Sequence, residues 1–185
     1  MELSDHSPGP GTLLIAPPAV MDPNFFRAVV LLCEHTKDGS FGLILNRPIE
    51  VEIDILSGEL AGFEGGLSFG GPVQPDTLHF LHRLDLPETA SVMDGVGWGG
   101  DFDTLKALHR EQSLTGQHLK LFLGYSGWGA GQLHDEIQAG GWIVAEADSA
   151  AVFKDPPKEL WRKRLRRLGG EFAVLANFPI DPRLN

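Results

Sequence analysis

The chain has 185 residues, 42% of them hydrophobic and 22% charged, which suits one globular domain with a buried core. Cys33 is the only cysteine, so an intramolecular disulfide and a cysteine-rich metal site are excluded. The net charge of −10 disfavours attraction of the whole surface to nucleic acid or to an anionic membrane.

The N-terminal segment, residues 1–11, is polar and rich in Pro, Gly and Ser. Such a composition predicts a disordered tail, followed by a single domain over residues 12–185. The tail lacks the basic and apolar regions of a secretory signal. The longest apolar run, Ala28–Cys33, is far too short to span a membrane. We therefore expect a cytoplasmic protein.

Strand patterns dominate the first half of the chain. A turn at Asp22–Phe26 precedes a strand whose run AVVLLC indicates burial on both faces. The turn residues Lys37–Ser40 then lead back into a paired strand, which makes a hairpin. The predicted strands are Thr12–Ala16, Arg27–Glu34, Phe41–Leu45, a strand within Phe63–Gly71, Thr77–Leu84, Leu119–Gly124 and Trp142–Ala147.

Helical patterns follow in the second half. Asp101 or Asp103 is placed to cap a helix that ends near Gln112. Gly140-Gly141 ends a second helix. In the last long helix the expected apolar stripe is Trp161, Leu165 and Leu168. The predicted helices are Ile53–Leu60, Asp101–Gln112, Ala130–Ala139 and Pro157–Leu168. Hairpins mixed with strand–helix–strand stretches indicate an α+β fold with a mixed sheet.

The first candidate site is Leu119–Leu133, predicted as a strand, a glycine-rich turn and a helix N-terminus, where anions bind readily. The dinucleotide pattern fails because its last glycine position holds Gln132, and the nucleophile-elbow pattern fails at Trp128. The alternative is a tight turn with Trp128 packed on the core. The glycines that would let the backbone approach a ligand are Gly127, Gly129 and Gly131.

Two further segments could contribute to a site, one through polar side chains and the other through exposed backbone groups. Arg47 could bind a carboxylate or phosphate through two hydrogen bonds while Asn46 orients it. Alternatively, Asn46 satisfies turn backbone groups and Arg47 pairs with a surface acid. At Gly70-Gly71 no side chain covers the backbone. This leaves room either for a ligand or, as we expect, for close packing of a neighbouring strand.

A nucleophile is the next possibility. Cys33 and His35 lie two apart on a strand and project to the same face, as a nucleophile and base would. However, Cys33 continues an apolar run, and a buried thiol has little thiolate character. His79 and His82 would face opposite sides of their strand, so we expect no metal site.

The segment Lys158–Arg167 holds six basic residues and one acid, a local net charge of +5. Such a face could bind a phosphate backbone or an acidic protein. The alternative is a solvated outer face whose late cations suit the helix dipole. The basic face comprises Lys158, Arg162, Lys163, Arg166 and Arg167.

The chain resembles the YqgE/AlgH family of bacterial proteins in the blocks GTLLIAPP, MDPNFFRAVVLLCEH, GSFGLILNRP, FGGPV, LFLGYSGWGAGQLHDEI and GGWIVAEA. The resemblance implies a single α+β domain in which a bent, barrel-like sheet is surrounded by helices. The AlgH branch is named a transcriptional regulator, but the family offers no recognised DNA-binding motif. This sequence departs from the family pattern at His134, where Glu is usual, and at Thr77-Leu78, where Arg-Gly is frequent.

We expect a non-catalytic ligand-binding, partner-binding or regulatory protein, acting on a small anionic ligand or a protein partner without a cofactor. One alternative is a hydrolase with Ser126 or Cys33 as nucleophile, and another is weak nucleic-acid binding by the basic face. The expected ligand-binding residues are Asn46, Arg47, Gly70, Gly71, Tyr125, Ser126, Trp128 and Gln132.

Overall fold

The hairpin of β2 (Val29–Thr36) and β3 (Gly39–Ile44) forms as its sequence predicts, because the apolar run of β2 is buried on both faces of the sheet. The computed structural model describes residues 7–50, 58–112 and 114–180. In it, Leu31 and Cys33 pack into one hydrophobic cluster, while Val30 and Leu32 pack into another on the opposite face. A register shift between Leu32 and Glu34 adds a bulge to the hairpin.

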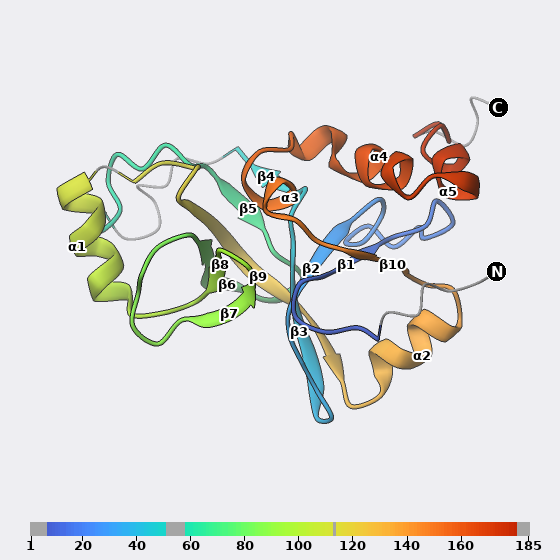
Figure 1. Ribbon diagram of the computed structural model, residues 1–185, viewed down its shortest axis with the longest axis horizontal. Coiled ribbons are helices and arrows are strands. Elements are labelled where there is room, and N and C mark those ends of the chain that lie inside the picture. The colour runs from blue at the N-terminus through green and yellow to red at the C-terminus, as the bar shows by residue number, and fades with distance from the viewer. Residues whose placement is uncertain (1–6, 51–57, 113, 181–185) are drawn as a thin grey trace.

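One sheet of ten strands organises the described residues (Figure 1). Its main path runs β10-β1-β2-β3-β9-β6-β8-β7, and β5 joins β9 in the one parallel pairing. The strands are β1 (Thr12–Ile15), β2 (Val29–Thr36), β3 (Gly39–Ile44), β4 (Pro48–Ile49), β5 (Leu67–Phe69), β6 (Val73–His82), β7 (Ala90–Met93), β8 (Val96–Trp98), β9 (Leu119–Gly129) and β10 (Ile143–Glu146).

The sheet curls into a half-barrel, so the expected α+β fold with a bent, mixed sheet and surrounding helices is confirmed. Figure 1 shows α1 at the left end, α3, α4 and α5 along the top and α2 at the lower right. The helices are α1 (Phe102–Gln112), α2 (Gln132–Gln138), α3 (Ser149–Phe153), α4 (Pro157–Leu168) and α5 (Gly170–Leu175). Within the described ranges, no helix is long and apolar enough to cross a membrane.

Helices α3 and α4 close one face of the half-barrel. Their Phe153 and Trp161 pack into the same cluster as Leu13 and Leu43 from the sheet, and the Trp161 Nε1–H donates to the Ala16 carbonyl at 2.7 Å. Burial of aromatic rings of this size removes a large apolar area from water. The C-terminal helices are therefore part of the core.

Local signals placed α1 and α4 correctly. The backbone N–H of Thr104 donates to Asp101 Oδ2 at 2.9 Å, so Asp101 is the cap of α1. Helix α4 has the expected bounds, but its predicted stripe is wrong at Leu168, which is 38% exposed. The buried face instead contains Leu160 and Arg164 beside Trp161 and Leu165.

The prediction of a glycine-rich turn before α2 is also wrong. Gly127 and Gly129 belong to β9, which pairs with β3 as far as Gly39↔Gly129. Only Gly131 precedes the helix, with a φ of 77°. The pairing with β3 keeps the glycine backbone extended, which local propensity does not reveal.

Some expectations lie outside or at the edge of the described residues. The helix predicted at Ile53–Leu60 falls mostly on residues 51–57, which are outside them. The expected tail is described only from residue 7, and there the Gly11 N–H donates to the Leu32 carbonyl at 3.0 Å. The β7–β8 hairpin and the short helices α3 and α5 were not predicted from the sequence.

Candidate functional site

Asn46 and Arg47 hold the chain segment that enters β2. The Asn46 amide accepts from the Val29 N–H and donates to the Arg27 carbonyl, both at 2.9 Å. The Arg47 Nη2 donates to the Phe26 carbonyl, and burial lowers the pKa of Arg47. Asn46 therefore satisfies backbone groups of a turn, as its alternative supposed, whereas Arg47 bonds a backbone carbonyl and not the surface acid that its alternative supposed.

The glycines Gly70 and Gly71 lie against β9. A Cβ at Gly71 would lie 2.2 Å from the Tyr125 carbonyl carbon, and one at Gly70 would lie 2.3 Å from the Gly124 oxygen. The Phe69 N–H donates to the Arg47 carbonyl at 2.7 Å, so the backbone around Asn46-Arg47 runs beside the backbone around Gly70-Gly71. Close approach of two chain segments accounts for these glycines.

The candidate residues of the segment Leu119–Leu133 lie in two environments. Trp128 and Gln132 both donate to the Glu136 carboxylate of α2 at 2.9 Å, and Trp142 donates to it at 2.8 Å. Tyr125, by contrast, stacks on Phe41 with ring centroids 4.6 Å apart. The structure thus brings the backbones of the blocks together but points their side chains in different directions.

Neither proposed nucleophile contacts a histidine among the described residues. Ser126 is fully buried, and its hydroxyl donates to the Gly70 carbonyl at 3.1 Å. Burial raises the pKa of the Cys33 thiol, whose contact is with the Leu31 carbonyl. A serine–histidine contact does occur between Ser40 and His35, at 2.7 Å across the β2–β3 hairpin. The same part of the chain holds no cluster of three or more His, Cys, Asp or Glu side chains suited to a metal ion.

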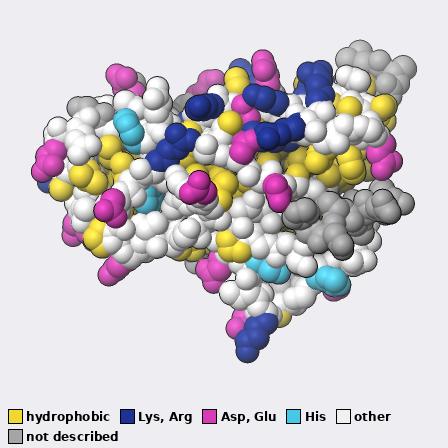
Figure 2. Space-filling model, viewed as in Figure 1, with side chains coloured by type: hydrophobic (Ala, Val, Ile, Leu, Met, Phe, Trp, Pro, Cys, Tyr) yellow, Lys and Arg dark blue, Asp and Glu magenta, His cyan; other side chains and the backbone are white. Residues whose placement is uncertain are grey.

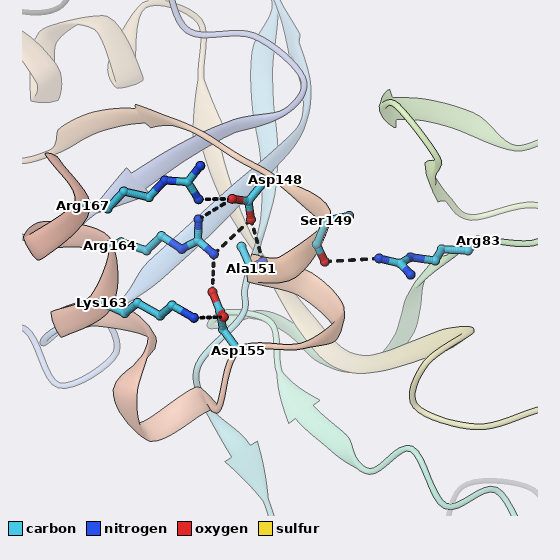
Figure 3. Close-up of polar contacts among 8 residues, drawn as sticks. All are labelled: Arg83, Asp148, Ser149, Ala151, Asp155, Lys163, Arg164 and Arg167. Atoms are coloured by element: carbon cyan, nitrogen blue, oxygen red, sulfur yellow. Dashed lines mark hydrogen bonds and ion pairs between the residues drawn. The ribbon is translucent and has the colours of Figure 1, made fainter.

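The densest group of charges joins α4 to α3 (Figure 3). Arg164 is 3% exposed and makes a two-bond pair with Asp148, with Nη1–Oδ2 and Nη2–Oδ1 both at 3.0 Å. The Arg164 Nη2 also forms an ion pair with Asp155, and Lys163 pairs with the same carboxylate. Arg167 forms a second ion pair with Asp148. Asp148 additionally caps α3 by accepting from the Ala151 N–H at 2.9 Å. Sequence reasoning missed Arg164 and both acids.

The electrostatics of this group follow from its contacts. Burial alone would raise the pKa of Asp148, but hydrogen bonds from Arg164, the Ala151 N–H and Arg167 outweigh it and hold that pKa well below its ordinary value. For Arg164 burial acts to lower the pKa, and the bonds to both acids more than offset it, so its pKa is raised. Asp148 and Arg164 are therefore both charged at neutral pH.

A groove lies beside this group, between the edge strand β10 and α4. Its volume is about 330 Å³, and it is open to solvent on one side. Arg164 Nε is buried and has no hydrogen-bond partner among the described residues. Arg167 reaches the groove with a side chain that is 66% exposed. The residues that line the groove are Val144, Ala145, Glu146, Ala147, Asp148, Arg164, Arg167 and Leu168.

Three residues of the predicted basic face are engaged in contacts within the chain, and two of them pair with acids. Lys163 and Arg167 form ion pairs, and Arg162 donates to the Ala176 and Phe178 carbonyls at 3.1 and 3.3 Å. Figure 2 shows Lys and Arg side chains gathered over the top of the molecule with Asp and Glu among them, above a band of hydrophobic side chains. Lys158 and Arg166 are exposed on the same helix.

Comparison with known proteins identifies relatives over almost the whole chain. Residues 13–173 match the family described as AlgH-like. A UPF0301 protein of Cytophaga hutchinsonii is 44% identical over 178 residues, which cover 95% of this chain and 98% of the relative. A UPF0301 protein of Chlorobium limicola is 44% identical over 181 residues, with 95% of each chain covered.

Two solved structures share the fold. A crystal structure of a protein from Corynebacterium diphtheriae has a TM-score of 0.78 at 24% identity and covers 94% of each chain. The solution structure of AlgH from Pseudomonas aeruginosa has a TM-score of 0.73 at 29% identity, covering 98% of this chain and 100% of AlgH. The names of these relatives give no activity, ligand or partner.

Proposed function

The chain belongs to the AlgH-like family, and we propose that it is a non-catalytic binding protein that holds a small anionic group in the groove between β10 and α4. One observation carries the proposal: a buried arginine, Arg164, lines this groove and keeps an unpartnered Nε–H. Buried polar groups are almost always hydrogen-bonded, so an unpaired N–H on an arginine that lines a hollow is the observation that motivates the proposal of an acceptor there.

The arginine donors beside the groove favour a negative ligand. Arg164, Arg167 and Lys163 pair with Asp148 and Asp155, and Glu146, which also lines the groove, brings the sum of these charges to zero, so the ligand is selected by directed hydrogen bonds and not by excess charge. Arg167 places one Nη on Asp148, which leaves other donors of its guanidinium for a second acceptor. Arginine recognises carboxylate and phosphate through paired, planar hydrogen bonds. We therefore assign the ligand to these two chemical groups.

The rest of the lining suits a small molecule or a short side chain. Val144, Ala145, Ala147 and Leu168 supply apolar surface beside the two arginines. A volume of about 330 Å³ lies at the small end of the range for ligand pockets. An apolar lining with a few convergent polar groups is the usual composition of such a pocket. We infer that this binding takes place in the cytoplasm.

Two alternatives have less support. A hydrolase needs its nucleophile within reach of a base, but Ser126 and Cys33 bond to backbone carbonyls. Duplex DNA needs an extended set of unpaired, exposed cations, whereas Lys163 and Arg167, two of the five on the basic face, already have acid partners and the whole chain has a net charge of −10. The regulator role attached to one branch of the family is therefore best explained by ligand binding rather than by DNA contact through α4.

We expect inorganic phosphate to stabilise the protein through this groove. At a phosphate concentration of about 100 times Kd, mass action adds roughly 2.7 kcal/mol to the free energy of unfolding. Arg167→Gln should remove most of that stabilisation, because it deletes the exposed guanidinium and leaves the buried pair of Arg164 intact. The measurement is urea unfolding in phosphate against chloride at equal ionic strength, and then in acetate.

Arg166→Gln is the matched control, since Arg166 is exposed on the same helix and does not line the groove. Phosphate also stabilises proteins generally by exclusion from their surface, and that part should be equal in both variants. Equal phosphate effects in the two variants, or none beyond that shared part in the wild type, would contradict the proposal.

A further inference from the structure

A second surface, independent of the groove, is a group of four aromatic rings that we call the aromatic platform. Phe41 of β3 stacks on Tyr125 of β9, with ring centroids 4.6 Å apart, and the ring of Trp98 of β8 lies 4.4 Å from it, tilted by 31°. His79 of β6 meets Phe41 and Tyr125 edge-on, at 5.1 and 5.6 Å. All four rings remain partly exposed, although such rings normally dominate the buried core.

Glycines keep one side of the platform open. On β9 the residue opposite Phe41 is Gly127, and the residue opposite Gly39 is Gly129. Gly127 and Gly129 are both exposed, so no side chain from these positions covers Phe41 or Tyr125. A Cβ at Gly127 would lie 3.0 Å from Tyr125 Cε2, which shows how closely the ring lies over the bare backbone. The half-barrel therefore leaves the stacked rings partly uncovered here.

One exposed acid lies beside the platform. On β2 the residue opposite Phe41 is Glu34, which is exposed. Side chains directly opposite on paired strands lie within contact distance. Burial lowers the pKa of His79, so the imidazole is neutral at neutral pH and does not repel a cation. The chain as a whole carries a net charge of −10.

The chain itself supplies no cation to these rings. Elsewhere it places Arg27 over Phe26 and Trp161, Arg83 over Phe153 and Lys106 over Phe102. Among the described residues no such contact involves a ring of the platform. Arginine stacks on aromatic faces and pairs with carboxylates, so the combination of platform and Glu34 suits a guanidinium from outside.

We propose that the aromatic platform is a docking surface for a basic segment of a partner protein, which lays an arginine side chain on Tyr125 or Trp98 and pairs it with Glu34. Charge complementarity selects this partner over an acidic peptide or a nucleic acid, because the surface of this protein repels both. The stacked rings supply contact area at a low cost in side-chain entropy.

The test uses the full chain and a fluorescein-labelled peptide of six arginine–glycine repeats with blocked ends. The reference peptide replaces each arginine with citrulline, which keeps the shape and removes the charge. Fluorescence anisotropy should show the arginine peptide binding at least about tenfold more tightly than the citrulline peptide. Tyr125→Leu should weaken binding about fivefold, and Glu34→Gln about threefold.

The rival explanation is general attraction of a basic peptide to an acidic protein, and Asp38→Asn is the control for it. Asp38 is an exposed acid at the tip of the same hairpin, away from the rings. The proposal requires Asp38→Asn to leave the affinity within about 1.5-fold, because screening by salt weakens distant surface charges. Thermal melts establish that each variant is folded, and Glu34→Gln replaces an exposed side chain.

Three results would overturn the proposal. The first is the absence of binding by the arginine peptide, and the second is equal loss of affinity in Glu34→Gln and Asp38→Asn. The third is a concentration-dependent dimer in sedimentation velocity that Tyr125→Leu abolishes while the peptide does not compete. That third result would assign the platform to a second copy of this chain.

Discussion

Replacing Arg164 with methionine should lower the free energy of unfolding by about 3–5 kcal/mol, because it leaves buried acids short of a partner. Asp155 has a side chain that is only 4% exposed, and it would keep Lys163 alone. Asp148 would lose its two-bond pair and keep Arg167. Urea unfolding at neutral pH measures the loss.

Two further variants test whether the expected loss of stability arises from the unpaired acids. Arg166→Met changes an exposed residue of the same helix and should alter stability by no more than about 0.5 kcal/mol. Asp155→Asn in the Arg164→Met background should recover part of the loss, because the uncompensated charge is then removed. A loss below about 1 kcal/mol in Arg164→Met would show that water already screens these charges.

Gly71→Ala should be at least as damaging, with a loss above about 4 kcal/mol or failure to fold. The added Cβ would lie 2.2–2.4 Å from three backbone atoms of Tyr125 and Ser126, which cannot move without breaking the pairing of β9. The φ of Gly71, 153°, is also one that residues with a side chain rarely adopt. Soluble yield and urea unfolding measure the effect.

Gly129→Ala is the matched control, on the strand β9 that Gly71 lies against. The nearest heavy atom to its added Cβ is Gln132 Oε1 at 3.9 Å, an ordinary contact distance. Its stability should stay within about 1 kcal/mol of the wild type. Wild-type stability in Gly71→Ala would mean that the backbone at Gly71 is bared for a ligand and not for strand packing.

Much of the fold could be predicted from local signals. The apolar run of β2 and the turn after it specify a hairpin, and the Asp101 cap with its following periodicity specifies α1. The bounds of α4 follow from Pro157 at its start and Gly169 just past its end. The barrel-like curvature came from the family resemblance, since strand periodicity carries no information on the order of strands.

Other features depend on residues far apart in the sequence. The extended backbone at Gly127 and Gly129 is imposed by β3, more than 80 positions earlier. The hairpin of β7 and β8 has short strands around Asp94-Gly95, and too few apolar residues to form a pattern. Such short strands are stabilised by pairing partners more than by propensity.

The candidate groove could not be predicted for the same reason. A cluster of cations on a helix most often faces water, which argued against burial of Arg164. Its position between Trp161 and Leu165 on the inward face is the one signal that was present in the sequence. The two acids that pair it come from the loops before and after α3, which no helix-periodicity argument connects to α4.

The central claim, that an anionic group binds between β10 and α4, is tested most directly by phosphate titration of ¹⁵N-labelled protein. Amide shift changes should saturate and concentrate on residues 144–148 and 164–168, and Arg167→Gln should abolish them while Arg166→Gln preserves them. Non-saturating changes spread over Lys158, Arg162 and Arg166, or changes confined to residues outside the groove, would contradict the claim.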